Sequence, residues 1–391
     1  MKLLIVHNRY IHRGGEDVCV DNEIGALRQA GVAIVDFQVQ SDASLIRKTQ
    51  GLSSPFSNQF QKNLLDIMHR ERPDILHAHN LFPLLSPRVF AQAKRQSIAT
   101  VLTLHNFRPL CLNGLFLTPD HEVCERCLPG NYWPGIVRGC YRDSPLQSLW
   151  LASHLTLAKW QSWYDQVDQL IAPSEFLKNK FIEAGWSGSR IEVQGHFIPD
   201  LTTQTPIPPD PYILYLGRLS EEKGVPWILD VFRDPPMPIK LLIAGQGPLE
   251  ERVRQGCGPH ISYSGYLEGK AKEKALRHAL ALVMPSECYE NFPLAVAEAN
   301  AWGVPALVCD EGGLKELVRP GVNGERFARR DMPSFWSAVE RIIPPNHEVD
   351  FRRSAQDYAR ERFSKDRFLT RRLALYDRVS SLSGLRQCVE N

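Results

Sequence analysis

Short apolar runs alternate with amphipathic stretches along most of this 391-residue chain. In the first half, the apolar runs predict strands at residues 3–6, 32–37, 75–79, 100–105 and 169–172. Helical patterns occupy about 18–30, 87–96 and 174–184. Strands that alternate with helices predict a parallel sheet with helices on both faces.

A proline-rich break divides this alternation. Residues 199–211 hold five prolines, which suits an extended linker. The alternation then resumes, with strands expected at 212–216, 240–244, 261–264, 280–284 and 306–309. Helices are expected near 226–232, 249–255 and 271–279, and the tail from 333 reads as mostly helical.

These patterns predict an α/β protein with two doubly wound, Rossmann-like domains that face each other across a cleft. The expected domains are 1–198, with a cysteine-rich insertion at about 107–145, and 212–365, joined by the linker 199–211. Residues 366–391 form a helical tail that can pack back on the N-terminal domain.

Composition narrows the function classes. A net charge of +2 excludes a polycation of the kind that binds nucleic acid, so no nucleic-acid partner is expected. The first apolar run is too short for a secretory signal, and no run approaches the ~20 residues that span a bilayer. We therefore expect a cytoplasmic protein, and leave open its peripheral attachment to the inner membrane face.

Two glutamates near the C-terminal end carry the strongest chemical signal. Glu298 lies within an Ala-rich stretch that is expected to be a helix, with Pro293 in its first turn, and Glu290 lies in the loop just before it. The motif follows the apolar run 279–285, so it sits where a strand passes into a helix and open α/β sheets bind ligands. A helix N-terminus can bind an anion, which suits a sugar joined to a nucleotide diphosphate. The alternative is an ordinary pair of surface glutamates.

Three motifs together resemble the GT-B glycosyltransferases. They are Gly217-Arg-Leu-Ser-Glu-Glu-Lys223-Gly224, the turn Gly245-Gln-Gly247-Pro248, and the segment from Glu290 to Glu298. More narrowly, the chain is similar to the large retaining family that includes sucrose synthases and many bacterial polysaccharide and lipid glycosyltransferases.

This resemblance implies roles for the residues of the second half. Arg218 and Lys223 would hold the donor diphosphate, because their cations offset the negative charge of the leaving group. Glu290 would contact the donor sugar, and Glu298 the ribose. The other positions implied in donor binding are Gly217, Gly245, Asn291, Phe292 and Leu294. Many members of the family have Gly where this chain has Pro293, whose ring nitrogen cannot donate a hydrogen bond.

The first half matches the family at two places. Gly14 and Gly15 follow the first strand, where the family has a glycine-rich loop facing the donor, and Thr103-Leu-His105-Asn106 resembles the family's Thr-x-His-Asp. The resemblance implies that His105 lies near the donor sugar and the acceptor. Asn106 replaces the usual Asp, so a role that needs a carboxylate there is not expected. We interpret the other strand-end histidines, His77 and His79, as structural.

Four cysteines follow His105 at symmetric spacing. Twelve residues separate Cys111 from Cys124 and Cys127 from Cys140, around a central Cys-x-x-Cys. Four thiols in such a pattern suit a structural zinc ion, which would supply folding energy to a segment poor in apolar residues. An iron–sulfur cluster, a redox pair and unconnected thiols are the alternatives.

The sequence thus predicts a retaining glycosyltransferase that moves a sugar from a UDP- or GDP-sugar to a saccharide or lipid-linked hydroxyl acceptor, in polysaccharide or glycolipid synthesis. No cofactor is expected for catalysis. The alternatives are a phosphorylase or epimerase on the same fold, and a protein that binds a nucleotide sugar without turnover. A tryptophan-rich helix at 148–164 is read as core, or else as a membrane-surface helix.

Overall fold

The computed structural model describes residues 1–11, 13–40, 59–128, 130–198, 212–343 and 350–390, with side chains up to 381. The expected linker, 199–211, lies outside the described residues. The chain divides into two compact units, which we describe separately. The first contains Met1–Gly114, Arg126–His196 and Asp366–Asn391, and the second contains Leu115–Glu125 and Phe197–Lys365.

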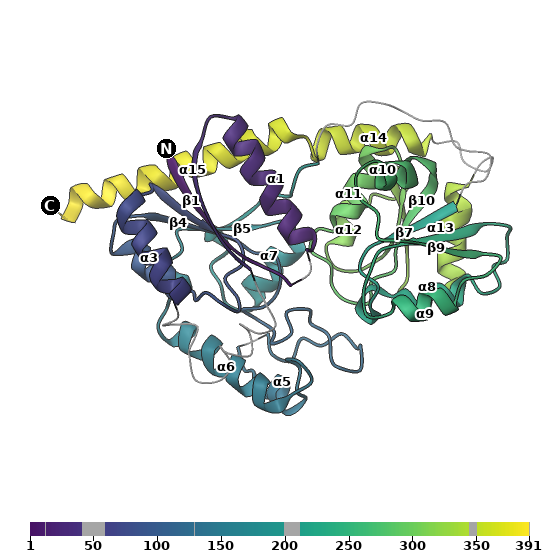
Figure 1. The fold of residues 1–391 in the computed structure, drawn as a ribbon, viewed down its shortest axis with the longest axis horizontal. Helices are drawn as coiled ribbons and strands as arrows, with labels where there is room; N and C mark the ends of the chain where they lie inside the picture. Colours follow the sequence, from purple (N-terminus) through teal and green to yellow (C-terminus); the bar gives the residue numbers. More distant parts are fainter. Residues whose placement is uncertain (12, 41–58, 129, 199–211, 344–349, 391) are drawn as a thin grey trace. The chain divides into compact units, whose positions relative to one another are not determined.

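The first unit is built on a six-stranded parallel sheet with the order β2-β1-β3-β4-β5-β6 (Figure 1). The strands inside the sheet are largely buried, as expected for a parallel sheet covered on both faces, whereas the edge strands β2 and β6 are only partly buried. The strands are β1 (Lys2–Arg9), β2 (Ala33–Gln40), β3 (Ile75–Ala78), β4 (Ala99–Thr103), β5 (Gln169–Ala172) and β6 (Ile191–Val193).

Helices and short 3-10 turns connect these strands. They are α1 (Gly15–Gln29), α3 (Gln59–Glu71), α4 (Arg88–Lys94), α5 (Trp133–Val137), α6 (Pro145–Trp160), η1 (Tyr164–Gln166), α7 (Glu175–Glu183) and η2 (Gly188–Arg190). Ser144 and Ser174 cap α6 and α7 by accepting backbone N–H bonds. α5 and α6 pair with each other and extend beyond the sheet of this unit (Figure 1).

The C-terminal helix α15 (Lys365–Glu390) packs on the first unit from Asp366 onward. Tyr376 and its neighbours join the apolar cluster of β1 and α1. Arg372 is fully buried, and its Nη1 donates to Glu23 Oε1 at 2.8 Å. The pair places opposite charges together, since either one alone would be costly inside the protein.

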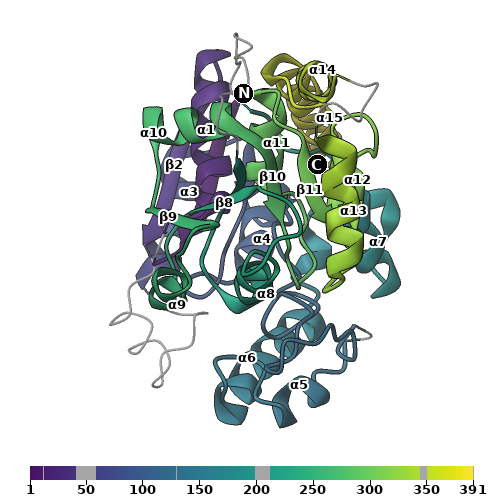
Figure 2. The ribbon, with the colours of Figure 1, turned by 90° about the vertical axis from the view of Figure 1, so that its right-hand side faces the viewer.

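The second unit repeats the architecture, with the order β12-β11-β10-β7-β8-β9 and all strands parallel. Figure 2 shows the helices of this unit, coloured from green to yellow, around its sheet. Its strands are β7 (Tyr212–Leu216), β8 (Lys240–Ala244), β9 (Ile261–Gly265), β10 (Ala279–Met284), β11 (Ala306–Cys309) and β12 (Gly324–Phe327). Its helices are η3 (Glu221–Lys223), α8 (Val225–Val231), α9 (Glu250–Gln255), α10 (Gly269–His278), α11 (Leu294–Ala301), α12 (Leu314–Leu317), α13 (Met332–Ile342) and α14 (Phe351–Arg362).

The two units divide the cysteine-rich insertion between them. Residues 115–125, expected in the insertion of the N-terminal domain, group with the second unit. Arg330 Nη1 lies 3.2 Å from Glu122 Oε1, and the ring of Phe116 meets that of Tyr289 at 6.3 Å. An ion pair and a ring contact therefore tie this segment to the second unit.

All ten strands expected from the apolar runs are present. The pattern missed β6 and β12, which are short and carry charged residues, and it missed α3, an amphipathic helix in which polar residues outnumber apolar ones. The expected tryptophan-rich helix begins earlier, at Pro145, because Ser144 caps it. Its tryptophans divide: Trp163 just beyond the helix is buried, whereas Trp160 is 77% exposed, so the core interpretation holds for only part of the segment.

Candidate active site

In the second unit, β7 and β10 are neighbours from which the strand order runs in opposite directions. The carboxyl ends at such a switch point are where open α/β sheets bind ligands. The loop after β7 carries Arg218 and Lys223, and the loop after β10 carries Glu290. The topology thus brings the charged residues expected from the sequence to one edge of one sheet.

Lys223 and Glu290 form a direct ion pair. Lys223 Nζ lies 2.6 Å from Glu290 Oε1, which also accepts a hydrogen bond from Ser286 Oγ at 2.6 Å. Burial opposes the charge of the ammonium, but the Glu290 carboxylate outweighs it, so the pKa of Lys223 is raised above its ordinary value. Lys223 therefore stays a cation at every physiological pH.

Close backbone contacts hold the two loops together. Glu287 N donates to Glu222 O at 2.9 Å, which joins one loop to the other. Gly224 has a φ of +72°, and a side chain there would lie 1.9 Å from Pro285 O. Only glycine fits this position, so Gly224 fixes the geometry of the Lys223–Glu290 pair.

Arg218 differs from Lys223 because it is exposed and its guanidinium makes no hydrogen bond or ion pair with the described residues. Its backbone is nevertheless held: Tyr215 Oη donates to Arg218 O at 2.6 Å, and Gly217 N donates to Ala244 O at 3.1 Å. A fixed backbone with an uncommitted side chain suits a residue that binds an external anion.

The glycines of the next loop have a packing role. A side chain at Gly245 would lie 1.8 Å from Gly217 O, and one at Gly247 would lie 2.4 Å from Leu219 O. Both glycines allow the loop after β8 to pack against the Arg218 loop. Gly245, expected in donor binding, thus has a structural function that explains it without a ligand.

Glu298 lies one turn inside α11 and pairs with another helix. Its Oε2 is 2.6 Å from Lys272 Nζ on α10. Pro293 is the N-cap of α11, so the helix begins at Leu294, one residue after the expected start. The ψ of 113° at Pro293 is extended, which explains why that residue is outside the helix. Asn291 and Phe292 lie in the loop between Glu290 and this N-terminus.

In the first unit, the switch point lies between β1 and β3. His7 belongs to β1, and Nε2 of its ring lies 2.8 Å from Asp17 Oδ1 on α1. Gly14 caps α1 and Gly15 is its first residue. A side chain at either glycine would meet no atom within 4 Å. Neither packing nor a positive φ requires glycine here, in contrast to Gly224, so open space remains for a ligand to approach the backbone.

His105 follows β4 and contacts two other histidines. Its Nε2 lies 3.0 Å from Nδ1 of His79, and its ring stacks on that of His196 with a centroid distance of 5.4 Å. Burial lowers the pKa of His105 well below its ordinary value, and it lowers the pKa of His196 to about 3. The three imidazoles are therefore neutral, because burial lowers the pKa of His79 as well. His79, which we interpreted as structural, contacts the site directly.

A pocket of about 80 Å³ opens beside these rings. His79, His105 and Arg108 line one part of it, and Leu151 and Leu155 of α6 line another. Three buried polar atoms on this side of the unit have no hydrogen-bond partner among the described residues: His7 Nδ1, Glu16 Oε1 and His79 Nε2. Burial raises the pKa of Glu16 to about 7. Unsatisfied buried groups of this kind are rare and mark positions where a ligand or water completes the bonding.

Asn106, at the position where the family usually has Asp, closes a turn. Its Oδ1 accepts a hydrogen bond from Arg108 N at 2.9 Å. An aspartate would accept the same bond, so the substitution keeps the local geometry and removes only the charge. His196 was missed because β6, which it follows, is too short to read from the sequence.

One group in the described chain brings three potential metal ligands within 4.8 Å of one another: Glu23, His77 and His79. Glu23 already pairs with Arg372, and His77 bonds Tyr376 Oη and Thr103 Oγ1 at 2.8 Å each. These partners occupy both ring nitrogens of His77 and one oxygen of Glu23, which agrees with a structural function for His77.

The cysteines of the insertion are partly gathered in the first unit. Cys111 and Cys127 are buried, and both thiols lie near Tyr132, where they and burial raise the pKa of the phenol. Cys140 packs against the same small apolar cluster. Cys124 is partly exposed and lies in the segment that groups with the second unit.

Two family models match the chain in succession. Residues 45–199 match Glycosyltransferase Family 4, and residues 199–362 match Glycosyl transferases group 1. Glycogen synthase of Mycobacterium tuberculosis is 32% identical over 162 residues, which cover 39% of this chain and 38% of that protein. The chain spans little more than a third of the length of the first curated relatives that it matches.

Solved structures agree with the whole fold. Sucrose-phosphate synthase from Thermosynechococcus elongatus superposes with a TM-score of 0.70 at 15% identity, over 98% of this chain and 100% of that one. Anabaena HepE, solved in complex with UDP and glucose, gives 0.65 at 16% identity, over 96% and 99%. The two glycosyltransferase models together cover residues 45–362, and the fold is that of the GT-B glycosyltransferases. None of the helices in the described part of the chain has the length and apolar content needed to cross a bilayer.

Proposed function

We propose that this chain is a retaining glycosyltransferase that transfers a sugar from a nucleotide diphosphate donor to a hydroxyl acceptor in polysaccharide or glycolipid synthesis. The observation that carries the proposal is the pairing of Lys223 with Glu290 at the switch point of the second sheet, with the uncommitted guanidinium of Arg218 in the same loop as Lys223. Family membership supports the transferase class, and the HepE complex with UDP and glucose supports a nucleotide sugar as the donor.

The donor diphosphate would bind in the second unit. Arg218 would fork two phosphate oxygens, and Lys223 would add a cation that Glu290 holds in place. Negative charge grows on the diphosphate as the sugar leaves, so these cations stabilise the transition state more than the ground state. The N-terminus of α11, with Leu294 as its first residue, would add backbone donors.

Glu298 would accept hydrogen bonds from the ribose, with Lys272 holding its carboxylate, and Glu290 would orient the sugar. His105 would line the reacting face as a neutral imidazole. We assign the acceptor's proton to the leaving phosphate, so the new bond forms on the face that the diphosphate leaves and the anomeric configuration is kept. No cofactor takes part in this step.

The experiment begins with a thermal-shift screen of the full chain against UDP-, GDP- and ADP-sugars. A true donor raises the melting temperature because it binds only the folded state. The anomeric configuration of the product, read by NMR, then separates retention from inversion. Phosphate-dependent sugar release without an acceptor, or donor binding with no turnover against any acceptor, would contradict the proposal.

We also propose that Cys111, Cys124, Cys127 and Cys140 bind a structural zinc ion. The buried thiols of Cys111 and Cys127 beside Tyr132, and Cys140 on the same cluster, support it. Purified protein should carry one zinc per chain, and Cys127→Ser should lose it with a lower melting temperature. Cys257→Ser changes an exposed cysteine elsewhere and is the control. Protein without stoichiometric metal, or with the visible absorption of an iron–sulfur cluster, would contradict zinc.

A further inference from the structure

Half of the large apolar side chains exposed in the described chain are concentrated on one small part of the first unit. Ten such side chains are exposed, and five of them lie between residues 133 and 160. Leu146 is 79% exposed and Trp160 is 77% exposed. We call these five residues the α5–α6 surface: Trp133, Val137, Leu146, Leu149 and Trp160.

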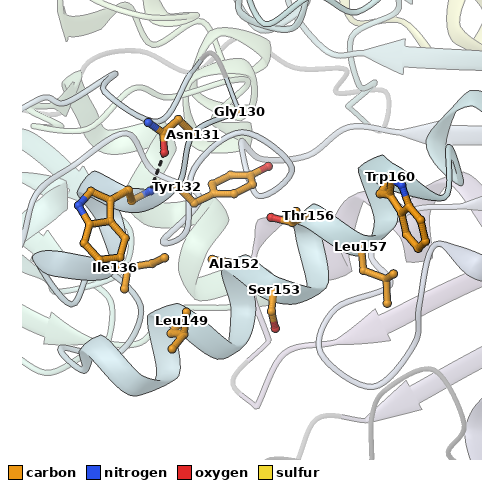
Figure 3. A pocket seen from close by; sticks show the side chains of 11 residues that line it. Gly130, Asn131, Tyr132, Ile136, Leu149, Ala152, Ser153, Thr156, Leu157 and Trp160 are labelled. Carbon is orange, nitrogen blue, oxygen red and sulfur yellow. Dashed lines mark hydrogen bonds between the residues drawn. The ribbon is translucent and has the colours of Figure 1, made fainter.

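A groove of about 530 Å³ runs along this surface between α6 and the segment that leads into α5 (Figure 3). Leu149, Leu157 and Trp160 line it from α6, while Tyr132 and Ile136 line it from the other side. Apolar side chains dominate the lining, although Ser153 and Thr156 also face the groove. The groove is therefore an amphipathic hollow in an exposed surface, and it does not belong to the histidine pocket described above.

Positive charge is interleaved with these apolar side chains. Between residues 130 and 161 the chain has Arg138, Arg142 and Lys159, against the single acid Asp143. All three cations are exposed. Lys159 Nζ would lie 2.6 Å from a side-chain carbon at Gly130, so the ammonium sits at the wall of the groove. A surface that combines exposed indoles with cations suits a layer of anionic headgroups over acyl chains.

Helix α6 is apolar on two opposite faces. At 100° per residue, Leu146, Leu149 and Trp160 lie opposite Leu151, Leu155 and Ala158. The first set is exposed, while the second set is buried and lines the pocket that holds His79 and His105. A helix with a second apolar face can bury that face against a second apolar environment. One helix diameter, roughly 10 Å, thus separates the exposed face from the histidine pocket.

We propose that the α5–α6 surface docks on an anionic lipid bilayer. The indoles of Trp133 and Trp160 would enter the interface, and Arg138, Arg142 and Lys159 would meet the headgroups. A bilayer is favoured over a protein partner because exposed indoles and cations on one surface match anionic headgroups over acyl chains. The docking deepens the function proposed above, since it would bring the His105 pocket to a lipid-anchored acceptor.

The test is co-sedimentation of the full chain with vesicles of phosphatidylcholine, with and without phosphatidylglycerol. Wild type should bind the mixed vesicles, and added salt should weaken that binding. The double variant Trp133→Ala/Trp160→Ala should lower the partition coefficient by about tenfold or more, because two exposed apolar groups no longer enter the interface. Replacing Arg138, Arg142 and Lys159 by Gln should lower binding to the mixed vesicles by about tenfold and leave the weak binding to phosphatidylcholine unchanged.

The matched control is Ile182→Ala/Tyr266→Ala, which removes two exposed apolar side chains from other parts of the chain. It should bind vesicles as wild type does. Because Trp133 and Trp160 are exposed, circular dichroism and the melting temperature should be the same for the wild type and the double variant. A double variant that binds as well as wild type, or a wild type that binds neither vesicle, would overturn the proposal.

Light scattering supplies the remaining outcome. If the wild type is a dimer that the Trp133→Ala/Trp160→Ala variant dissociates, the surface joins two copies of the chain and the bilayer proposal is wrong. No donor is present in any of these measurements. Vesicle binding without sugar-nucleotide binding in the thermal-shift screen would therefore refute the proposed transferase and keep the docking surface. Sugar-nucleotide binding without vesicle binding would keep the transferase and refute the docking surface.

Discussion

The two units present chemically opposite groups at equivalent places. The second unit places a lysine–glutamate pair and an exposed arginine at the switch point of its sheet, whereas the first unit places buried neutral imidazoles after β3, β4 and β6. Charge suits a diphosphate, and a neutral, partly enclosed pocket suits a hydroxyl group. The same topology thus supports two kinds of recognition, and the loops decide which.

The glycines of the two units differ in the same way. A side-chain carbon at Gly224 or Gly245 would lie 1.9 or 1.8 Å from a backbone oxygen of a neighbouring loop, so only glycine allows these loops to pack. Gly14 and Gly15 have no such neighbour. A glycine that packing explains says little about ligands, while one that packing does not explain points to close approach by something outside the chain.

The sharpest test of the charged side is Arg218→Ala. Turnover should fall about 10³-fold, because charge on the leaving diphosphate loses a bidentate donor. Stability should not change, since the guanidinium is exposed and bonds none of the described residues. Steady-state kinetics and thermal melts measure both. Lys270→Ala, an exposed cation on α10, is the control, and near-normal turnover in Arg218→Ala would remove the assigned role.

His105→Ala tests the neutral side. Turnover should fall about 10²-fold through lost positioning, and the KM of the acceptor should rise while that of the donor changes little. Arg218→Ala should instead raise the KM of the donor. Kinetics with each substrate varied in turn would compare the two variants. If both variants raised the same KM, the division of labour between the units would be wrong.

The pH dependence of stability should come from the first unit. The folded pKa of His196 is about 3, below its ordinary value, so the unfolded state binds the extra proton and stability is lost as the pH falls below about 6.5. At pH 5 the protonation of His196 in the unfolded state lowers the free energy of unfolding by about 2 kcal/mol, or about 30-fold in the folding equilibrium. Lys223 stays charged throughout this range. Denaturant unfolding at pH 5 and at pH 8 measures this loss of stability. The difference in the free energy of unfolding between the two pH values should be smaller in His196→Gln.

The smallest effect is expected at Glu298. Glu298→Gln should raise the donor KM about tenfold, because a neutral amide accepts a weaker hydrogen bond from ribose than a carboxylate does. The residue is partly exposed and its ion pair with Lys272 adds little stability. Lys272→Gln is the companion variant. An unchanged KM in Glu298→Gln would place the ribose elsewhere.

The sequence alone predicted the architecture and the charged residues of the candidate site in the second unit. The apolar runs located ten of the twelve strands in the described residues, because buried parallel strands need continuous apolar side chains. The spacing of Arg218, Lys223 and Glu290 after two of those strands predicted that they would gather, since parallel strands end at one edge. These are local signals, and each can be read within about ten residues.

Only the tertiary structure decided the neutral half. His79, His105 and His196 come from three separate strand ends, and β6 is too short to be read from its three residues. The pKa values of these histidines fall because the surrounding chain excludes water, which no local pattern encodes. The same holds for α6, whose two apolar faces look alike in the sequence. Packing buries one of them and leaves the other exposed, because only one face has a partner in the fold.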